Sequence, residues 1–218
     1  MDRHARANRS IAARLIALPL LLLLTISPAS AFTIVITPAA PRTIYLQVGV
    51  GSFTGFYSSG GTPQDNSTIN VVSLTVPAAQ VGTGVSQTMT SNSTASNSFY
   101  DNRVFCSTPN QVYIGGFYRR ADATAGSAAT LRATKPANLV NASGDTIPFS
   151  QISWTSSGIG DAGAQPFPSG TFAAGTQTIG TIPRNRWSES CHTFRYANTS
   201  LRPAGTYTGR VTYTLTAP

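Results

Sequence analysis

Ionisable side chains are scarce in this chain of 218 residues, which has 15 Lys and Arg, 7 Asp and Glu, and 2 His. One histidine, His192, lies beyond the N-terminal segment, so the chain offers no His/Cys ligand set with metal spacing. The acids beyond residue 31 are dispersed beside turn-forming residues, a pattern that does not indicate the paired carboxyls of glycosidases. They are Asp65, Asp101, Asp122, Asp145, Asp161 and Glu189.

Nucleophile and phosphate-binding motifs are also missing. Neither G-x-S-x-G nor G-x-x-x-x-G-K-[ST] occurs. His192 follows Cys191 and lies near Ser188 and Ser190, but sequence neighbours do not make a catalytic triad. We predict that the protein is not an enzyme and needs no cofactor or metal, and that His192 lies at the surface or at a strand end. A hydrolase that uses His192 as its base is the open alternative.

Basic residues exceed acidic ones without forming a stripe. Beyond residue 31 there are ten Arg and one Lys, Lys135, against six acids. They are scattered apart from the pairs Arg119/Arg120 and Arg184/Arg186. Nucleic-acid-binding proteins concentrate their basic residues on one face or along one helix. We therefore predict no nucleic-acid partner.

A single long hydrophobic run stands near the N-terminus. Basic residues up to Arg14 precede the apolar segment 15–26, and the small residues Ala29 and Ala31 match an A-x-A cleavage site. The apolar segment is shorter than the ~20 residues of a spanning helix. We predict a signal-peptide helix over residues 1–31, cleavage after Ala31, and a secreted single domain over 32–218 with no stable membrane span. An uncleaved N-terminal anchor is the alternative.

Cysteine is limited to Cys106 and Cys191. An even count in an exported protein favours a disulfide, here closing a loop of 84 intervening residues. The chain-entropy estimate for such a loop is about 4–5 kcal/mol at most. Two free buried thiols or a metal-binding pair are the alternatives.

The remaining sequence has the period of β-strands. Apolar residues alternate at positions 32–36, 44–50, 72–76, 112–114 and 207–215, with polar or small residues between many of them. Turn clusters at 58–61, 141–145 and 156–161 separate such runs, and the Ser/Thr/Asn-rich stretch 82–102 is typical of a long surface loop. No segment beyond residue 31 has helical apolar spacing. These features predict an all-β sandwich or barrel whose strands hide one face and wet the other.

The C-terminal run resembles the closing strand of chaperone–usher pilus subunits, in particular the archaic group with the spore coat protein U-like domain. In that family a G-x-Y element precedes alternating apolar and Thr residues. Here Gly205 and Tyr207 precede Val211, Tyr213 and Leu215, and Thr stands at 212, 214 and 216. The export signal, the scarcity of charge and the cysteine pair are similar to the family as well. One departure is Ala217, which stands where better-known pilins carry an aromatic residue.

The resemblance implies an immunoglobulin-like β-sandwich that lacks one strand. Gly205, Tyr207, Val211, Tyr213 and Leu215 would then form the strand that borders the groove and meets a periplasmic chaperone. An N-terminal strand of the next subunit would replace the chaperone by strand addition, with Phe32, Ile34 and Ile36 as its donor residues. Pro38 and Pro41 follow closely, so this donor strand would be short. The implied function is an exported structural or adhesive subunit of a surface fibre. Such a subunit passes through the periplasm and is then assembled at the cell surface.

A self-contained secreted binding module is the alternative of a different class. In that case the C-terminal run is an ordinary closing strand of a complete sandwich. Exposed aromatic residues could then form a glycan-binding patch, for which the candidates are Trp154, Trp187, Tyr100, Tyr118 and Tyr196.

Overall fold

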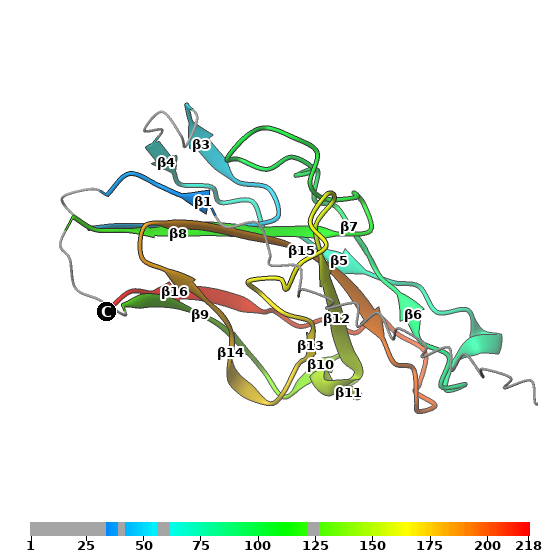
Figure 1. Ribbon diagram of the computed structural model, residues 1–218. Helices are drawn as coiled ribbons and strands as arrows, with labels where there is room; N and C mark the ends of the chain where they lie inside the picture. The colour runs from blue at the N-terminus through cyan, green and yellow to red at the C-terminus, as the bar shows by residue number, and fades with distance from the viewer. Residues whose placement is uncertain (1–33, 39–41, 56–61, 122–126) are drawn as a thin grey trace, which may run out of the picture.

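The computed structural model describes residues 34–38, 42–55, 62–121 and 127–218 (Figure 1). Among these residues, short 3-10 turns occur at η2 (Ala78–Gln80) and η3 (Phe149–Gln151), and every other regular element is a strand. The strands are β1 (Ile34–Val35), β2 (Thr43–Val48), β3 (Ser52–Thr54), β4 (Thr62–Gln64), β5 (Val72–Ser73), β6 (Gln87–Thr88), β7 (Thr90–Ser91), β8 (Val112–Arg119), β9 (Ala128–Lys135), β10 (Asn138–Val140), β11 (Thr146–Pro148), β12 (Ile152–Ser157), β13 (Gly170–Thr171), β14 (Gly175–Pro183), β15 (Arg186–Tyr196) and β16 (Thr212–Thr216).

Two antiparallel sheets face each other as a sandwich, which confirms the predicted fold class. The large sheet has the order β13-β12-β15-β8-β2, and β1 and β6 also pair with β15. The small sheet has the order β14-β9-β16. Figure 1 shows the small sheet below the large one, with β1, β3 and β4 above it. Three separate strand pairs, β3–β4, β5–β7 and β10–β11, complete the described structure.

The main core lies between the sheets. Alternate residues of β8, such as Ile114 and Tyr118, point toward Leu131 of β9 and Ile182 of β14, and all four side chains are fully buried. Leu215 of β16 packs into the same cluster. Because each strand presents every second residue to this interface, the period-two pattern of the sequence directly produces the core.

A second core covers the opposite face of the large sheet. Tyr113 and Phe117, the alternate residues of β8, pack there against Trp187 of β15, Tyr45 of β2 and the disulfide. The residues between β7 and β8 and the β3–β4 pair supply partly buried aromatic residues that cover this cluster. The expectation of one wet face is therefore wrong for β8, where seven consecutive residues are buried.

Local predictions from the sequence are confirmed in part. The turn at 141–145 joins β10 to β11, and 158–161 form a turn after β12. The stretch 82–102 is largely irregular, but β6 and β7 lie within it. The C-terminal run is divided, because Thr208 bridges Val140 and the ladder with β9 starts only at Thr212. The turn cluster at 58–61 lies outside the described residues.

Several arginines that are far apart in sequence meet at one end of the large sheet. Arg119 and Arg120 lie at the end of β8, and the paired start of β15 carries Arg186. Arg184 bridges the same end of β8, and Arg42 directly precedes β2. The antiparallel register therefore brings both pairs to the same edge, which their positions in the sequence do not show.

Candidate functional site: an open edge between the two sheets

His192 is a core residue and has no catalytic surroundings. It is fully buried, stacks on Trp154 with ring centroids 5.7 Å apart, and its Nε2 lies 3.0 Å from the Phe167 carbonyl oxygen. Its Nδ1 is buried without a hydrogen-bond partner. Burial lowers the pKa of His192 to about 4, so the imidazole is neutral near pH 7. The predicted surface or strand-end position is wrong, and water cannot reach this histidine.

The aromatic residues considered for a glycan patch do not share a surface. Trp154 is 4% exposed and belongs to the core between the sheets, whereas Trp187 is 2% exposed and belongs to the outer cluster. Tyr118 and Tyr196 are buried as well. The large sheet separates the two tryptophans, so the proposed patch is wrong for these residues.

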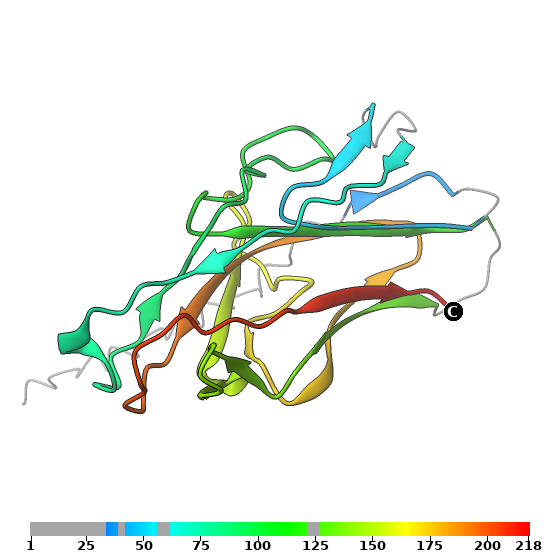
Figure 2. The same cartoon turned by 180° about the vertical axis from the view of Figure 1, so that it is seen from behind.

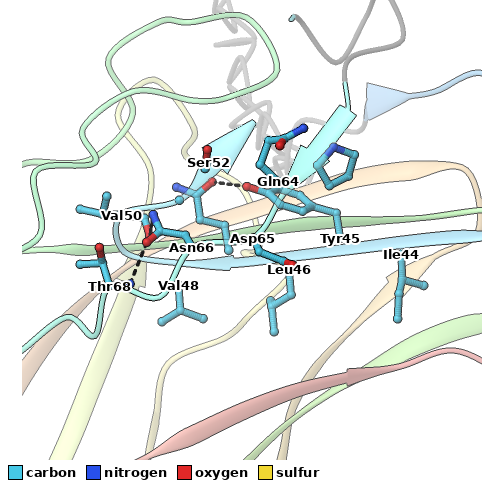
Figure 3. Close-up of a pocket in the computed structure, with 13 residues that line it drawn as sticks. Ile44, Tyr45, Leu46, Val48, Val50, Ser52, Gln64, Asp65, Asn66 and Thr68 are labelled. Atoms are coloured by element: carbon cyan, nitrogen blue, oxygen red, sulfur yellow. Dashed lines mark hydrogen bonds between the residues drawn. The ribbon is translucent and has the colours of Figure 1, made fainter. Parts of the chain in front are cut away.

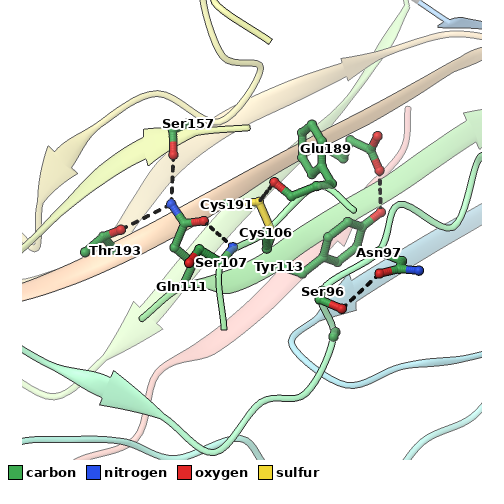
Figure 4. The surroundings of a disulfide bond; sticks show 12 residues. Ser96, Asn97, Cys106, Ser107, Gln111, Tyr113, Ser157, Glu189, Cys191 and Thr193 are labelled. Carbon is green, nitrogen blue, oxygen red and sulfur yellow. Dashed lines mark hydrogen bonds between the residues drawn. A yellow bond between two sulfur atoms is a disulfide. The ribbon is translucent and has the colours of Figure 1, made fainter. Parts of the chain in front are cut away.

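The disulfide is present between Cys106 and Cys191, whose Cα atoms are 5.5 Å apart. Both residues are buried in the outer cluster. Figure 4 shows the bond joining the segment before β8 to the middle of β15. The link therefore ties the outer layer to the large sheet, and the free-thiol and metal-pair alternatives are wrong.

A carboxylate lies beside this link. Glu189 Oε2 accepts a hydrogen bond from the Tyr113 hydroxyl at 2.7 Å (Figure 4). It accepts a second one from the Trp187 indole N–H at 2.8 Å. Burial raises the pKa of Glu189, although the hydrogen bonds from Trp187 and Tyr113 oppose that shift. The pKa of Tyr113 is also well above its usual value because that side chain is buried. With both hydrogen bonds made inside the protein, this group is best explained as a structural network.

The feature that stands out is a pair of edge strands on one flank of the sandwich. β2 ends the large sheet and pairs only with β8, and β16 ends the small sheet and pairs only with β9 among the described strands. Figure 2 shows both strands on the side facing the viewer, one above the other. Their Cα atoms approach within 8 Å, yet no ladder joins them in the described structure.

The hydrogen-bonding direction of β2 follows from its register. The Gly49 N–H donates to the Tyr113 carbonyl, so Gly49 faces β8. Strand residues alternate in the edge toward which their backbone groups point. Ile44, Leu46 and Val48 therefore point their N–H and C=O groups away from β8, toward the flank. Such groups can bind another strand.

Apolar side chains of β2 point from this flank into the space between the sheets. Figure 3 shows Ile44, Leu46 and Val48 directed toward the small sheet, whereas Tyr45 points to the opposite side. The side with Tyr45 and Gln47 is buried, while Ile44 remains 42% exposed and Leu46 and Val48 are partly exposed. A cavity of about 370 Å³ runs along the edge and is bounded by residues 44–48, 50–52, 63–66 and 68. The apolar face predicted from the sequence is thus the less buried one, because the sandwich is open beside it.

The residues predicted to border a groove are divided between strand and loop. Tyr213 and Leu215 lie on β16 and point between the sheets, Leu215 buried and Tyr213 partly so, and burial raises the pKa of the Tyr213 hydroxyl. Val211 directly precedes β16 and packs at the edge of the same core. Gly205 and Tyr207 lie in the preceding loop, where the Tyr207 hydroxyl donates to the Pro203 carbonyl oxygen. The prediction of one strand containing all five is wrong, because the chain bridges Val140 at Thr208 before it reaches β9.

Both ends of the open edge are bounded. At the start of β2, the Arg42 guanidinium donates to the main-chain oxygen of Pro218, which links the two edge strands. At the other end, the Asn70 side chain bonds with the backbone at Val48 and Val50. The part of β2 that lies between these two contacts is residues 43–47.

The predicted donor residues do not form an exposed extension. Ile34 pairs with Trp187 of β15, and the Ile36 N–H donates to the Asn185 carbonyl. Ile34 and Ile36 are each 6% exposed and belong to the outer cluster. The exposed-donor prediction is wrong for these two residues, since pairing with β15 and packing on Trp187 remove their apolar side chains from water. Phe32 lies outside the described residues, as do Ala29 and Ala31 of the predicted cleavage site.

Other candidate features can be stated for the described ranges only. None of the helical segments placed in the structure is long and apolar enough to cross a membrane. Within those ranges there is also no group of three or more His, Cys, Asp or Glu side chains placed to hold a metal ion.

Neither a protein-family model, nor a curated protein, nor a solved structure matches this chain.

Sequence reasoning identified β16 but missed the importance of β2 and of Asn70. The alternation at 44–50 predicts a strand, but an edge strand and a central strand give the same alternation. A signal was nevertheless present: Gly49 interrupts the run where the Asn70 side chain approaches the backbone. Asn70 stands in a polar stretch, and nothing in its sequence context reveals a partner some twenty residues away.

Proposed function

We propose that this protein is an exported structural or adhesive subunit of a surface fibre that is assembled by strand addition. A strand of another polypeptide lies along β2, and its apolar side chains fill the mouth between β2 and β16. A periplasmic chaperone and neighbouring subunits are the proposed partners, each supplying such a strand in turn.

One observation carries this proposal: the two sheets end on the same flank in edge strands, and the core-side residues of β2 are only partly buried. Ile44 is 42% exposed although it lies on the core side of β2. An open, apolar strand edge is a template for pairing with another chain. Strand addition would bury these side chains and pair the outward backbone groups of Ile44 and Leu46.

The origin of the added strand follows from the position of β1. Because Ile34 and Ile36 pack on their own chain, they are not assigned as donors here. The proposal requires only that the incoming strand be a separate segment with alternate apolar residues. The bounded edge of β2 limits the paired part of that segment to about five residues.

A pair of substitutions at one position tests the proposal. Ile44→Pro removes an N–H that faces the open edge and leaves the ladder with β8 intact, because proline is tolerated on an edge strand at such a position. Ile44→Ala shortens the same side chain but keeps the N–H. We expect the exported chain (residues 32–218) and the Ile44→Ala variant to assemble with an added partner subunit that supplies the strand, and the Ile44→Pro variant to remain monomeric, in electron micrographs and unheated electrophoresis.

Circular dichroism of both variants provides the folding control. Equal assembly of the Ile44→Pro variant would contradict the proposal. So would a wild-type chain that stays a stable monomer and accepts no strand from any added partner.

A self-contained secreted binding module is the second candidate. It is favoured by β1, which pairs with β15 of its own chain and completes the outer cluster. This candidate predicts a wild-type chain that unfolds reversibly as a monomer. Its Ile44→Pro and Ile44→Ala variants should then be monomeric as well.

A further inference from the structure

We propose that Asn70 is a stop that sets the length and register of the strand accepted by β2. This inference rests on the proposed function. It assigns a specificity role to a residue that lies outside both edge strands.

The Asn70 side chain occupies the position of a neighbouring backbone. Its Nδ2 donates to the Val48 carbonyl oxygen at 2.9 Å, and its Oδ1 accepts the Val50 N–H at 3.2 Å. Both backbone groups point toward the open flank, because Gly49 between them faces β8. One side-chain amide thus supplies the donor and the acceptor that another strand would otherwise supply.

The local sequence is adapted to this contact. Gly49 has a φ of +72°, and a Cβ at this position would collide with the Asn70 amide. The next residue, Val71, is held by Asn92: its N–H donates to Asn92 Oδ1 at 2.8 Å, and its carbonyl accepts the Asn92 N–H at 3.0 Å. Asn70 is therefore fixed from both sides instead of being a mobile surface amide.

The consequence is a defined reading length, meaning the number of β2 residues that can pair with an incoming strand. Beyond Gln47 the Val48 carbonyl and the Val50 N–H are already bonded to Asn70, so a longer incoming strand cannot form hydrogen bonds with these two groups. Before Thr43, the link from Arg42 to Pro218 bounds the other end. The strand that fits spans residues 43–47, or about 17 Å at the rise of a β-strand.

The test compares two peptide lengths on three proteins. Fluorescein-labelled peptides of alternating Val and Thr, five and nine residues long with a Lys-Lys tail, are titrated by fluorescence polarisation. We expect the wild type and an Asn138→Ala variant to bind both lengths within about twofold of each other. With Asn70→Ala, the nine-residue peptide should bind roughly tenfold more tightly than the five-residue one, since about two more backbone hydrogen bonds become available.

Amide hydrogen exchange gives a second readout that needs no peptide. The Val50 amide should be protected in the wild type and in Asn138→Ala, and should exchange at least tenfold faster in Asn70→Ala while the β8 amides keep their protection. Asn138 is the matched control because it lies on β10 and does not line the cavity along β2.

The outcomes separate the two proposals. If both peptides bind but the length ratio is the same in Asn70→Ala and wild type, or if Val50 stays equally protected, the role of Asn70 is refuted and strand acceptance stands. If no peptide binds to any of the three proteins, strand acceptance by β2 fails, and the reading-length role fails with it.

Discussion

His192 shows how a single residue makes the protein sensitive to acid. Its pKa is about 4 in the folded chain and 6.5 in the unfolded chain, because burial disfavours the charged imidazolium. The buried Nδ1 also has no hydrogen-bond partner that would stabilise the charged form. Between these values the unfolded state binds the proton and the folded state does not. Stability is therefore complete above pH 6.5, falls as the pH drops toward 4, and changes no further below that on account of this group.

We predict that this group lowers the free energy of unfolding by on the order of 3 kcal/mol between pH 7 and pH 4. His192→Gln keeps an N–H for the Phe167 carbonyl oxygen but does not titrate, so its stability curve should be flatter over this range. Urea titrations at several pH values measure the difference. Glu189 has a raised pKa and acts in the opposite direction, but it contributes equally to both proteins and cancels in the comparison. Parallel curves for wild type and His192→Gln would contradict the prediction.

The residue scale is also where sequence reasoning was weakest. One buried histidine and two buried tryptophans look the same in sequence as exposed ones, because polar and aromatic residues occur on both faces of a strand. The cysteine pair could be predicted, since an even count in an exported chain leaves few alternatives. The partner of Asn70 could not, because the contact depends on how two distant backbone segments cross.

Among the strands, β1 differs most from its predicted role, because the sequence predicted an exposed donor strand and the structure shows a packed one. It is only two residues long, yet Ile34 and Ile36 are nearly buried while Val35 between them is 68% exposed. β1 therefore completes the outer cluster in the way a longer strand would. The alternation that predicted a strand here was informative, but it could not say which chain the strand would pair with.

We predict that Ile36→Ser lowers the free energy of unfolding by roughly 2–4 kcal/mol, because it removes a buried branched side chain and places a hydroxyl in an apolar cluster. Val35→Ser, at the neighbouring exposed position, is the matched control and should stay within about 0.5 kcal/mol of wild type. Thermal and urea unfolding of both variants measures this. Equal effects of the two substitutions would show that β1 is not packed as described.

Edge strands mark the limit of prediction at this scale. The periods at 44–50 and 207–215 predicted strands, and β2 and β16 were found there. The period does not distinguish a strand with two neighbours from a strand with one. The difference appears only as partial exposure of an apolar face, as at Ile44, which is a property of the assembled sheets.

For the whole molecule, the sequence predicted an all-β sandwich correctly but not its layering. The turn clusters and the lack of helical spacing were enough for the class. The outer layer over the large sheet arises because β8 is apolar on both faces, with Tyr113 and Phe117 on one and Ile114 and Tyr118 on the other. A continuous apolar run of that length is ambiguous between a buried strand and other structures.

The disulfide is the covalent tie between these layers. We predict that replacing Cys106 and Cys191 together by Ala lowers the free energy of unfolding by up to about 4–5 kcal/mol, since the unfolded chain regains the freedom of a long loop. Wild-type protein unfolded with and without reductant serves as the control and should show the same difference. Equal stability of the oxidised and reduced chains would contradict the prediction.

That tie also determines when the protein can become fully rigid. The bond joins residues separated by 85 positions and forms only in an oxidising environment. In a reducing compartment the chain would lack the covalent link between its outer layer and the large sheet, and that layer would unfold more easily. In the export proposed above, oxidation beyond the membrane would form this link, so the outer layer would resist unfolding only after translocation.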